Sequence, residues 1–134
     1  MIRGVDSILL YVRDVDDSLR YYRDRLGFTP SFFAPEEGGV AGLQVGNIRM
    51  ILHTDQDLRP DYLQPSGERG RGVILHFEVE DVDRYHADLV GRGVEISLAP
   101  TEESWGARAM YLYDPDGYNI CFLQRPVATE GQLA

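Results

Sequence analysis

One short pattern occurs twice in this chain, and the two copies are 67 residues apart. Val12–Asp16 reads Val-Arg-Asp-Val-Asp and Val79–Asp83 reads Val-Glu-Asp-Val-Asp, so four of the five positions are identical. Each copy follows an apolar run of the kind that forms strands, Ser7–Tyr11 before the first and Ile74–Glu78 before the second. The duplication constrains the fold, because the two halves should adopt the same structure.

A helix is predicted directly after each copy of the pattern. Apolar residues recur at i, i+4, i+7 and i+11 within Val15–Leu26, and Val82–Leu89 shows similar helical spacing over two turns. The aspartates at both starts suit a helix N-terminus, where free backbone amides and the helix dipole favour acceptors and negative charge. Gly27 and Gly93 are placed to end the two helices.

Three strands are expected after each helix. Turn residues separate the strand-like runs, with Gly46-Asn47 in the first half and Asp114–Gly117 in the second. The expected strands cover 28–33, 40–45 and 48–54 in the first half and 94–98, 108–113 and 118–124 in the second. The sequence therefore predicts an α+β fold of two tandem βαβββ modules, 5–54 and 73–126, joined by a linker at 55–72 within a single domain, 1–134.

The size of one module implies that the two modules pair. A unit of roughly 50 residues buries little surface by itself. Its helix covers only one face of its sheet, so the other face has to meet something. Pairing of the modules predicts a curved, half-closed sheet with a concave interior that holds a small molecule.

Composition excludes several classes of protein. No apolar run approaches the roughly 18 residues needed to span a bilayer, and the first residues lack the apolar stretch of a signal peptide. The single cysteine, Cys121, allows neither an internal disulfide nor a Cys/His zinc pattern, and a cytoplasmic location is expected. The net charge of −9 disfavours nucleic acid as a partner, while it aids solubility or attracts a cationic ligand.

Three motifs in order resemble one known superfamily. They are the repeated Val-x-Asp-Val-Asp turn, the helix end at Leu19–Phe28, and the hairpin Asp114–Tyr118, which reads Asp-Pro-Asp-Gly-Tyr. Together they resemble the vicinal oxygen chelate superfamily and, within it, the glyoxalase and bleomycin-resistance family, over roughly residues 5–126. The resemblance implies the duplicated fold, whereas activity depends on the residues of the site.

The resemblance also implies where a metal would be held. Metal-dependent members bind one divalent ion through four residues at equivalent points of the two modules, usually His, Gln or Glu. In this chain those positions are Ser7, Met50, Ile74 and Cys121. None of them is a usual ligand for a hard, catalytic ion, which takes imidazole and carboxylate groups. No metal or cofactor is therefore expected, and the protein leans away from being an enzyme.

Alternation along the strands predicts which side chains line the interior. The predicted lining is mostly apolar with a few polar groups, which suits a flat and largely hydrophobic ligand. It consists of Ser7, Leu9, Tyr11, Met50 and Leu52 in the first module and Ile74, His76, Glu78, Asn119, Cys121 and Leu123 in the second.

Trp105 is the strongest single candidate for a ligand contact. It is the only tryptophan and precedes Gly106 just before an expected strand. Drug-binding members of the family commonly have a Trp-Gly pair here, and its indole stacks on the ligand; packing over the edge of the core is the alternative. Phe32, Phe33 and Tyr111 are further candidate walls, although adjacent Phe32 and Phe33 cannot both face inward.

These features lead to one functional hypothesis. The protein is expected to be a metal-free binding protein that sequesters a planar aromatic antibiotic or a related natural product, and so confers resistance by binding without turnover. Its partners would be that small aromatic ligand and a second copy of the chain, because family members of this type form homodimers that pair modules across chains. Neither nucleic acid nor a membrane is expected to bind.

Two other classes of function stay open. One is an enzyme of the same superfamily, either a metal-dependent lyase, isomerase or dioxygenase, or a metal-free isomerase that uses His76 or Glu78. The other is a module that senses a metabolite or regulates a protein. Cys121 is interpreted as an inert buried thiol, and the acidic residues Asp55, Asp57 and Asp61 form either a solvated loop or a rim for a cationic ligand.

Overall fold

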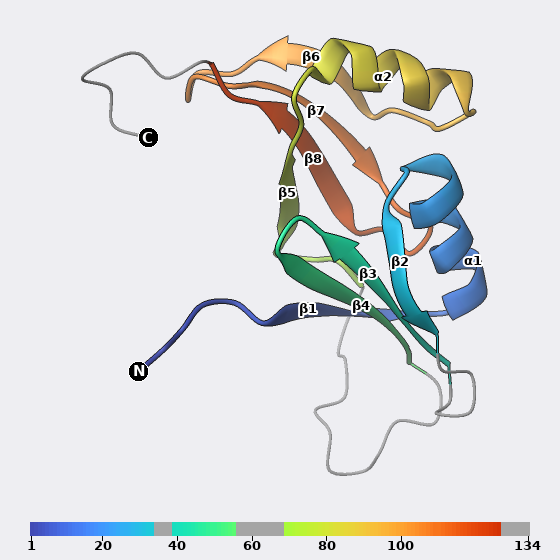
Figure 1. The fold of residues 1–134 in the computed structure, drawn as a ribbon. Coiled ribbons are helices and arrows are strands. Elements are labelled where there is room, and N and C mark those ends of the chain that lie inside the picture. The colour runs from blue at the N-terminus through green and yellow to red at the C-terminus, as the bar shows by residue number, and fades with distance from the viewer. Residues whose placement is uncertain (34–38, 56–68, 127–134) are drawn as a thin grey trace. The chain divides into compact units, whose positions relative to one another are not determined.

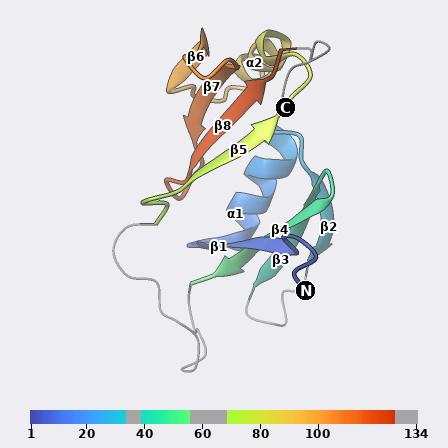
Figure 2. The same ribbon diagram turned by 90° about the vertical axis from the view of Figure 1, so that its left-hand side faces the viewer.

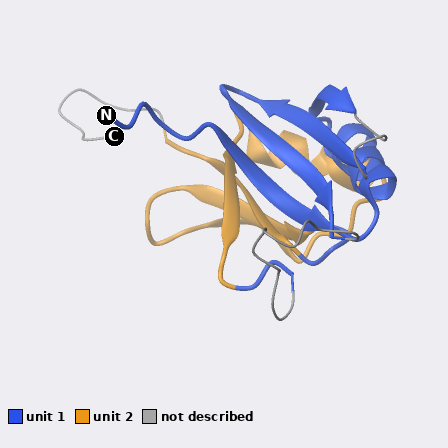
Figure 3. Cartoon of the chain, turned by 90° about the horizontal axis from the view of Figure 1, so that it is seen from below, with its two compact units in different colours: residues 1–71, 114–117 blue, residues 72–113, 118–134 orange. Residues whose placement is uncertain are grey.

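The computed structural model describes residues 1–33, 39–55 and 69–126, and these divide into two compact units (Figure 3). Unit 1 contains the residues up to Arg71 together with the turn Asp114–Gly117, and unit 2 contains Gly72–Tyr113 and the residues from Tyr118 onward. Within the predicted linker at 55–72, residues 56–68 lie outside the described part of the chain.

Unit 1 follows the predicted order of strand, helix and three strands. Its elements are β1 (Ser7–Val12), α1 (Val15–Arg20), a π-helical segment η1 (Tyr21–Arg25), β2 (Thr29–Phe33), β3 (Val40–Val45) and β4 (Ile48–Thr54). The sheet has the order β1-β4-β3-β2, with β1 and β4 parallel and the other pairs antiparallel (Figures 1 and 2). The helix packs on β3 and β4, so one face of this sheet is covered.

Unit 2 repeats this arrangement. Its elements are β5 (Ile74–Glu78), α2 (Val82–Gly91), β6 (Leu98–Glu102), β7 (Arg108–Tyr113) and β8 (Asn119–Gln124). The sheet order is β5-β8-β7-β6, again with one parallel pair, β5 with β8, and α2 packs on β6, β7 and β8 (Figure 1). The α+β class and the two tandem βαβββ modules are therefore confirmed.

The Val-x-Asp-Val-Asp pattern works as predicted at both helix starts. The side chain of Asp14 accepts a hydrogen bond from the backbone amide of Asp17 at 3.0 Å, and that of Asp81 accepts one from Arg84 at 3.1 Å. Both aspartates have extended backbones, as an N-cap requires. The duplication thus repeats a capping device.

Two elements differ from the sequence prediction by more than one residue. The first helix changes after Arg20 into a wider turn, in which the amide of Leu26 donates to the carbonyl of Tyr21. The strand predicted at 94–98 begins only at Leu98. The reason is that Val94 still belongs to the end of α2, because its amide donates to the Leu89 carbonyl at 3.0 Å.

One core layer of each unit lies between its helix and the covered face of its sheet. In unit 1 this layer includes Leu10, Val12, Tyr22, Leu26, Met50 and Leu52, and in unit 2 it includes Leu75, Leu89, Met110, Leu112, Ile120 and Phe122, all buried. The side of a sheet that its own helix does not cover is called the open face below. No helix within the described ranges is long and apolar enough to cross a membrane.

Candidate functional site

The open face of the second sheet carries the residues that the sequence predicts there. His76 pairs with Cys121, and Cys121 pairs with Tyr111, so these three side chains form a row across β5, β8 and β7. Ile74 and Asn119 pair one step earlier along the strands and project from the same face. Their neighbours Leu75, Ile120 and Leu112 are buried on the covered face.

A tight hairpin between β6 and β7 presents Trp105. The amide of Glu103 donates to the Ala107 carbonyl at 2.8 Å, and the amide of Gly106 donates to the Glu103 carbonyl at 3.0 Å. Gly106 has φ 97°, a conformation that closes a three-residue hairpin loop and that other residues rarely adopt. The Trp-Gly pair therefore has a local structural cause, since the glycine sets the turn that holds the indole.

The indole of Trp105 stacks on His76, with ring centroids 5.9 Å apart and planes inclined by 29°. Even so, 42% of Trp105 is exposed, an unusual fraction for the largest apolar side chain. The residue thus contacts a neighbour on the open face and still offers surface to a ligand. Both the packing and the ligand-stacking interpretations of Trp105 agree with this geometry.

The base of the Trp105 hairpin is tied to α2. The Nε and Nη2 atoms of Arg108 donate to the two carboxylate oxygens of Asp83, each at 2.9 Å. This forked pair lowers the pKa of Asp83 below its ordinary value, chiefly through the hydrogen bonds from Arg108. The hairpin is consequently oriented by a bidentate contact at its first strand residue.

Tyr111 and Cys121 form a hydrogen-bonded pair on the open face. They pack with the buried residues Ala107, Ala109 and Leu123 in one apolar cluster. Burial, followed by the hydrogen bond to Cys121, raises the pKa of Tyr111 to about 12. Burial also raises the pKa of the Cys121 thiol, so little of the nucleophilic thiolate forms near neutral pH. Cys121 therefore packs as a small apolar residue.

Asn119 has an unusual feature for this face. Its Oδ1 atom is buried, and it accepts no hydrogen bond from the residues that the structure describes. Buried acceptors are satisfied in most proteins, and exceptions often mark a water or a ligand group. Asn119 is accordingly a polar residue of this face whose acceptor is left unsatisfied by the described residues.

Two residues of the first sheet that were predicted to contact a ligand lie on its covered face instead. Met50 pairs with Ile8 and Leu52 pairs with Leu10, so both belong to the covered face. They are 2% and 0% exposed and form part of the core under α1. The prediction that Met50 and Leu52 line a ligand site beside Ser7, Leu9 and Tyr11 is therefore wrong.

The error comes from the length of one hairpin connection. In the second module Tyr113 pairs with Asn119 across five intervening residues, whereas the equivalent residues Gln44 and Arg49 are separated by four. A shift by one residue turns every side chain of a strand to the opposite face. Counting from the hairpin glycine, as the sequence prediction does, therefore selects the wrong face of β4.

Three other residues of β4 occupy the open face of the first sheet. Arg49 pairs with Ser7, Ile51 with Leu9, and His53 with Tyr11. The rings of Tyr11 and His53 meet edge to face at 5.9 Å, and the Nδ1 atom of His53 lies 2.7 Å from the Thr54 carbonyl oxygen. Sequence reasoning missed Arg49, Ile51 and His53, although the two-residue turn Gly46-Asn47 carried the signal for the register.

Phe32 covers the same open face from β2. It pairs with Gly42, and a Cβ atom on Gly42 would lie 2.3 Å from the Phe32 ring atom Cε1. The guanidinium carbon of Arg49 is 5.9 Å from the centre of this ring. Phe33 pairs with Ala41 on the opposite face, so its predicted role as a wall of the interior is wrong.

A catalytic metal ion does not fit the donors at the equivalent points of the two sheets. Cys121 lies two residues beyond Asn119, the partner of Ile74, and Ile51 lies two residues beyond Arg49, the partner of Ser7. The corrected set Ser7, Ile51, Ile74 and Cys121 contains no imidazole or carboxylate. Within the described residues, no three or more His, Cys, Asp and Glu side chains come together in a group that could hold a metal.

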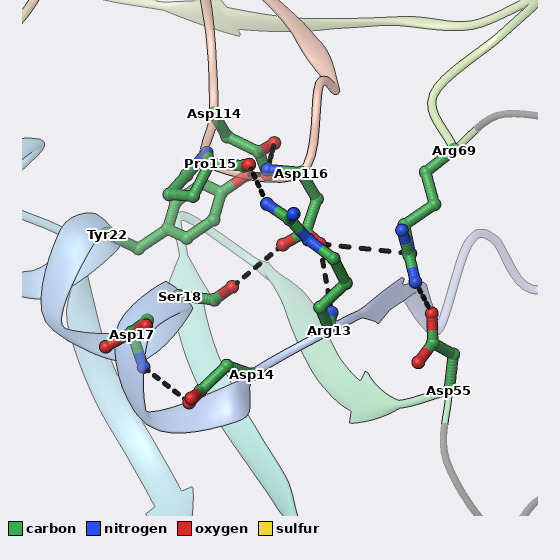
Figure 4. A network of polar contacts seen from close by, with 10 residues as sticks. All are labelled: Arg13, Asp14, Asp17, Ser18, Tyr22, Asp55, Arg69, Asp114, Pro115 and Asp116. Carbon is green, nitrogen blue, oxygen red and sulfur yellow. Dashed lines mark hydrogen bonds and ion pairs between the residues drawn. The ribbon is translucent and has the colours of Figure 1, made fainter.

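The turn Asp114–Gly117 enters a polar network in unit 1 (Figure 4). Asp116 accepts hydrogen bonds from the backbone amide and the side chain of Arg13, at 2.9 and 3.2 Å, and from the Ser18 hydroxyl at 3.2 Å. Tyr22 donates to Asp114 at 2.6 Å. A depression of about 290 Å³ lies beside Arg13 and Asp116. The polar groups of this network bond to one another, which indicates a structural role.

The same network engages one residue of the predicted acidic rim. Asp55 forms an ion pair with Arg69, which also lies 3.8 Å from Asp116 (Figure 4). The Asp55 side chain is only 8% exposed, and Arg69 already pairs with its charge. Asp57 and Asp61 lie outside the described residues.

The architecture and the site together define a class of protein. Two βαβββ units each present an open sheet face with aromatic side chains, and the positions that could hold a metal carry no suitable donors. The family model of the Glyoxalase/Bleomycin resistance protein/Dioxygenase superfamily matches residues 4–122. The chain belongs to this superfamily.

Known relatives agree with this membership. The uncharacterized protein YraH of Bacillus subtilis (strain 168) is 30% identical over 115 residues, which cover 82% of this chain and 89% of YraH. A glyoxalase/bleomycin resistance protein/dioxygenase from Nocardioides has a similar structure, with TM-score 0.79 and 24% identity over 100% of this chain and 91% of that one. A member of the superfamily from Sphaerobacter thermophilus DSM 20745 matches with TM-score 0.74 and 25% identity, covering 93% and 99%.

Proposed function

We propose that this protein binds a planar aromatic molecule, an antibiotic or a related natural product, and sequesters it without converting it. The observation that carries the proposal is Trp105, which a glycine-closed hairpin presents on the open face of the second sheet and which is 42% exposed. Aromatic stacking adds about 0.5–1.5 kcal/mol beyond the burial of apolar surface. An exposed indole held in place suits this role.

The surroundings of Trp105 support binding more than chemistry. The adjacent cluster around Ala107, Ala109 and Leu123 is apolar, and the pKa of its one thiol, Cys121, is raised by burial. A nucleophile or general base usually has a pKa poised near neutral pH. The carboxylates and imidazoles that would hold a catalytic metal are missing from Ser7, Ile51, Ile74 and Cys121.

A titration with planar aromatic antibiotics tests the proposal. Trp105 fluorescence should be quenched saturably by at least one compound, and mass spectrometry should recover that compound unchanged. Because Trp105→Ala removes the signal, its affinity is measured by calorimetry and should be about tenfold weaker, the upper end of what a stacking contact supplies. Phe33→Ala is the matched control, since Phe33 is 48% exposed but projects from the other face of its sheet. A broad panel without saturable binding, or equal affinity for Trp105→Ala, would contradict the proposal.

One observation favours a second function, a metal-free isomerase or cyclase. His76 is exposed and stacked on Trp105, and Glu78 projects from the same face two residues later. An imidazole beside a bound ligand can move a proton. Turnover of a bound compound that is abolished in His76→Ala, with affinity retained, would establish this enzyme in place of the binding protein.

The proposal includes a homodimer in the cytoplasm. Large apolar side chains such as Val73, Ile74 and Leu98 are between 45% and 47% exposed, more surface than a ligand alone covers. A second copy of the chain is the proposed cover. The single cysteine, unpaired and buried, suits a reducing compartment.

A further inference from the structure

The open face of the first sheet carries an arginine and, from β1 and β4, no acidic side chain, although the protein is acidic. The chain has 22 aspartates and glutamates against 13 lysines and arginines. Nevertheless, the side chains that β1 and β4 place on this face are Ser7, Leu9, Tyr11, Arg49, Ile51 and His53, none of them acidic. The overall charge of −9 predicts a cationic ligand, whereas the residues of this face predict an anionic ligand.

Arg49 is the cation of this face that can take a ligand. Arg13, Arg69 and Arg108 each pair with a carboxylate. Arg49 forms no ion pair with any described residue, and its recorded contact is the Phe32 ring at 5.9 Å. A guanidinium that lies over an aromatic ring and has no carboxylate partner keeps its forked N–H donors free for a ligand carboxylate.

Phe32 and Gly42 hold this arrangement in place. The Phe32 ring lies so close to Gly42 that a Cβ atom there would be 2.3 Å from it. The ring therefore rests on bare backbone, which positions the surface over which the Arg49 guanidinium lies. Such preorganisation lowers the entropic cost of binding.

His53 stands at the other end of the same strand. Because a carbonyl oxygen only accepts, the His53 Nδ1 atom must donate to the Thr54 carbonyl at 2.7 Å, which leaves Nε2 for another partner. Arg49 and His53 are four residues apart on one face, or about 13 Å along a strand. Ile51 lies between them, paired with Leu9, which is 44% exposed. Along β4 the face thus presents the cation Arg49, then the apolar pair Leu9 and Ile51, and then the polar ring of His53.

We propose that the open face of the first sheet is a binding site for a small planar aromatic carboxylate. Its carboxylate pairs with Arg49 and its ring covers Leu9 and Ile51. The observations behind this proposal all come from the first sheet, so it does not rest on the Trp105 contact proposed above.

Three naphthalene derivatives of equal size test the charge preference. They carry a carboxylate, a neutral carboxamide or a methylammonium group, and calorimetry measures the binding of each to the full-length protein. The carboxylate should bind about tenfold more tightly than the carboxamide, the usual scale of a charge-assisted hydrogen bond, and the methylammonium compound should bind more weakly still.

Variants locate the site. Arg49→Gln should reduce the preference for the carboxylate to less than about twofold, because only the charge-assisted contact is removed. Arg20→Gln is the matched control, since Arg20 lies on α1 and pairs with Asp17 there. Trp105→Ala should leave the binding of the carboxylate unchanged, because the contacts proposed for the carboxylate all come from the first sheet. The carboxylate test can therefore fail while the antibiotic titration succeeds, and the reverse.

Several outcomes would overturn the site. They are equal binding of carboxylate and carboxamide, tighter binding of the methylammonium compound, a preference that survives in Arg49→Gln, or no binding of the carboxylate at millimolar concentration. Loss of carboxylate binding in Trp105→Ala with Arg49→Gln unaffected would place the contact on the second sheet instead. Circular dichroism of each variant shows that it is folded.

Discussion

At Gly42 the absence of a side chain allows Phe32 to lie against the sheet. A Cβ atom would be 2.3 Å from the ring and 2.7 Å from the Ser31 hydroxyl oxygen, closer than real contacts. The backbone of Gly42 is not in the left-handed region, so the requirement for glycine is one of space alone. The lack of a Cβ atom at Gly42 therefore leaves the space that the Phe32 ring occupies.

Gly42→Ala should therefore displace the Phe32 ring and weaken the binding of the naphthalene carboxylate. Phe32 is 36% exposed and can swing outward, so the loss of stability should be at the low end for overpacking, about 1 kcal/mol. Gly91→Ala is the control, because its Cβ meets nothing within 4 Å and alanine favours a helix by up to about 1 kcal/mol. Urea unfolding measures both; equal stability and affinity in Gly42→Ala and wild type would show that the ring does not rest there.

Tyr111 predicts a loss of stability in alkali. A tyrosine in the unfolded chain ionises near pH 10, whereas Tyr111 in the folded protein has a pKa of about 12. The folded state then keeps a proton that the unfolded state loses, so this contribution is complete below pH 10 and disappears between pH 10 and 12. Urea unfolding at pH 9 to 11 should show a smaller decline for Tyr111→Phe than for wild type; parallel curves would contradict the shift.

At the level of elements, the repeated pattern codes for two helix caps. Asp14→Ala and Asp81→Ala should each lower the free energy of unfolding by about 1 kcal/mol, because each removes an acceptor from a first-turn amide. Asp16→Ala is the control: it lies in the same first turn but makes no recorded cap bond, and only the dipole term of about 0.3 kcal/mol should be lost. Thermal unfolding of the three variants checks the order, and an equal loss in all three would mean that charge, not capping, matters.

The elements were predictable from sequence because each has a local cause. Strands 40–45, 48–54, 74–78 and 108–113 match the prediction, since glycine and aspartate turns bound them. The start of β6 was not predictable, because the end of α2 uses Val94 in a hydrogen bond that no local pattern specifies. Local signals therefore fix which elements form, and less well where they begin.

The site was less predictable because it depends on register. The second sheet places His76, Asn119 and Cys121 as alternation predicts. In the first sheet a connection shorter by one residue moves Met50 and Leu52 into the core and brings Arg49 and His53 to the open face. Arg49 could not be recognised until the pairing of β3 with β4 was known, and the packing of Phe32 on Gly42 follows only from the pairing of β2 with β3.

For the whole molecule, the duplication preserves the scaffold and varies the open faces. In the first sheet the central row reads Leu9, Ile51, Gly42 and Phe32, and in the second it reads His76, Cys121, Tyr111 and Leu98. The aromatic ring comes from the edge strand over a glycine in the first case and from an inner strand in the second. Two faces of different chemistry on one repeated frame fit two distinct ligand contacts.

The proposed homodimer gives the last prediction, which concerns the charge of the whole chain. Each chain of 15.2 kDa carries a net charge of −9, so two copies repel each other over long range. Exposed apolar side chains, including Leu98 at 47% and Tyr113 at 57%, would supply the attraction, and a stable interface should bury more than about 1,000 Å². Salt screens repulsion and leaves apolar burial intact. Sedimentation equilibrium should therefore give twice the chain mass, with association that strengthens as sodium chloride rises; a dimer that weakens with salt would be held by ion pairs, and a monomer at micromolar concentration would end the proposal.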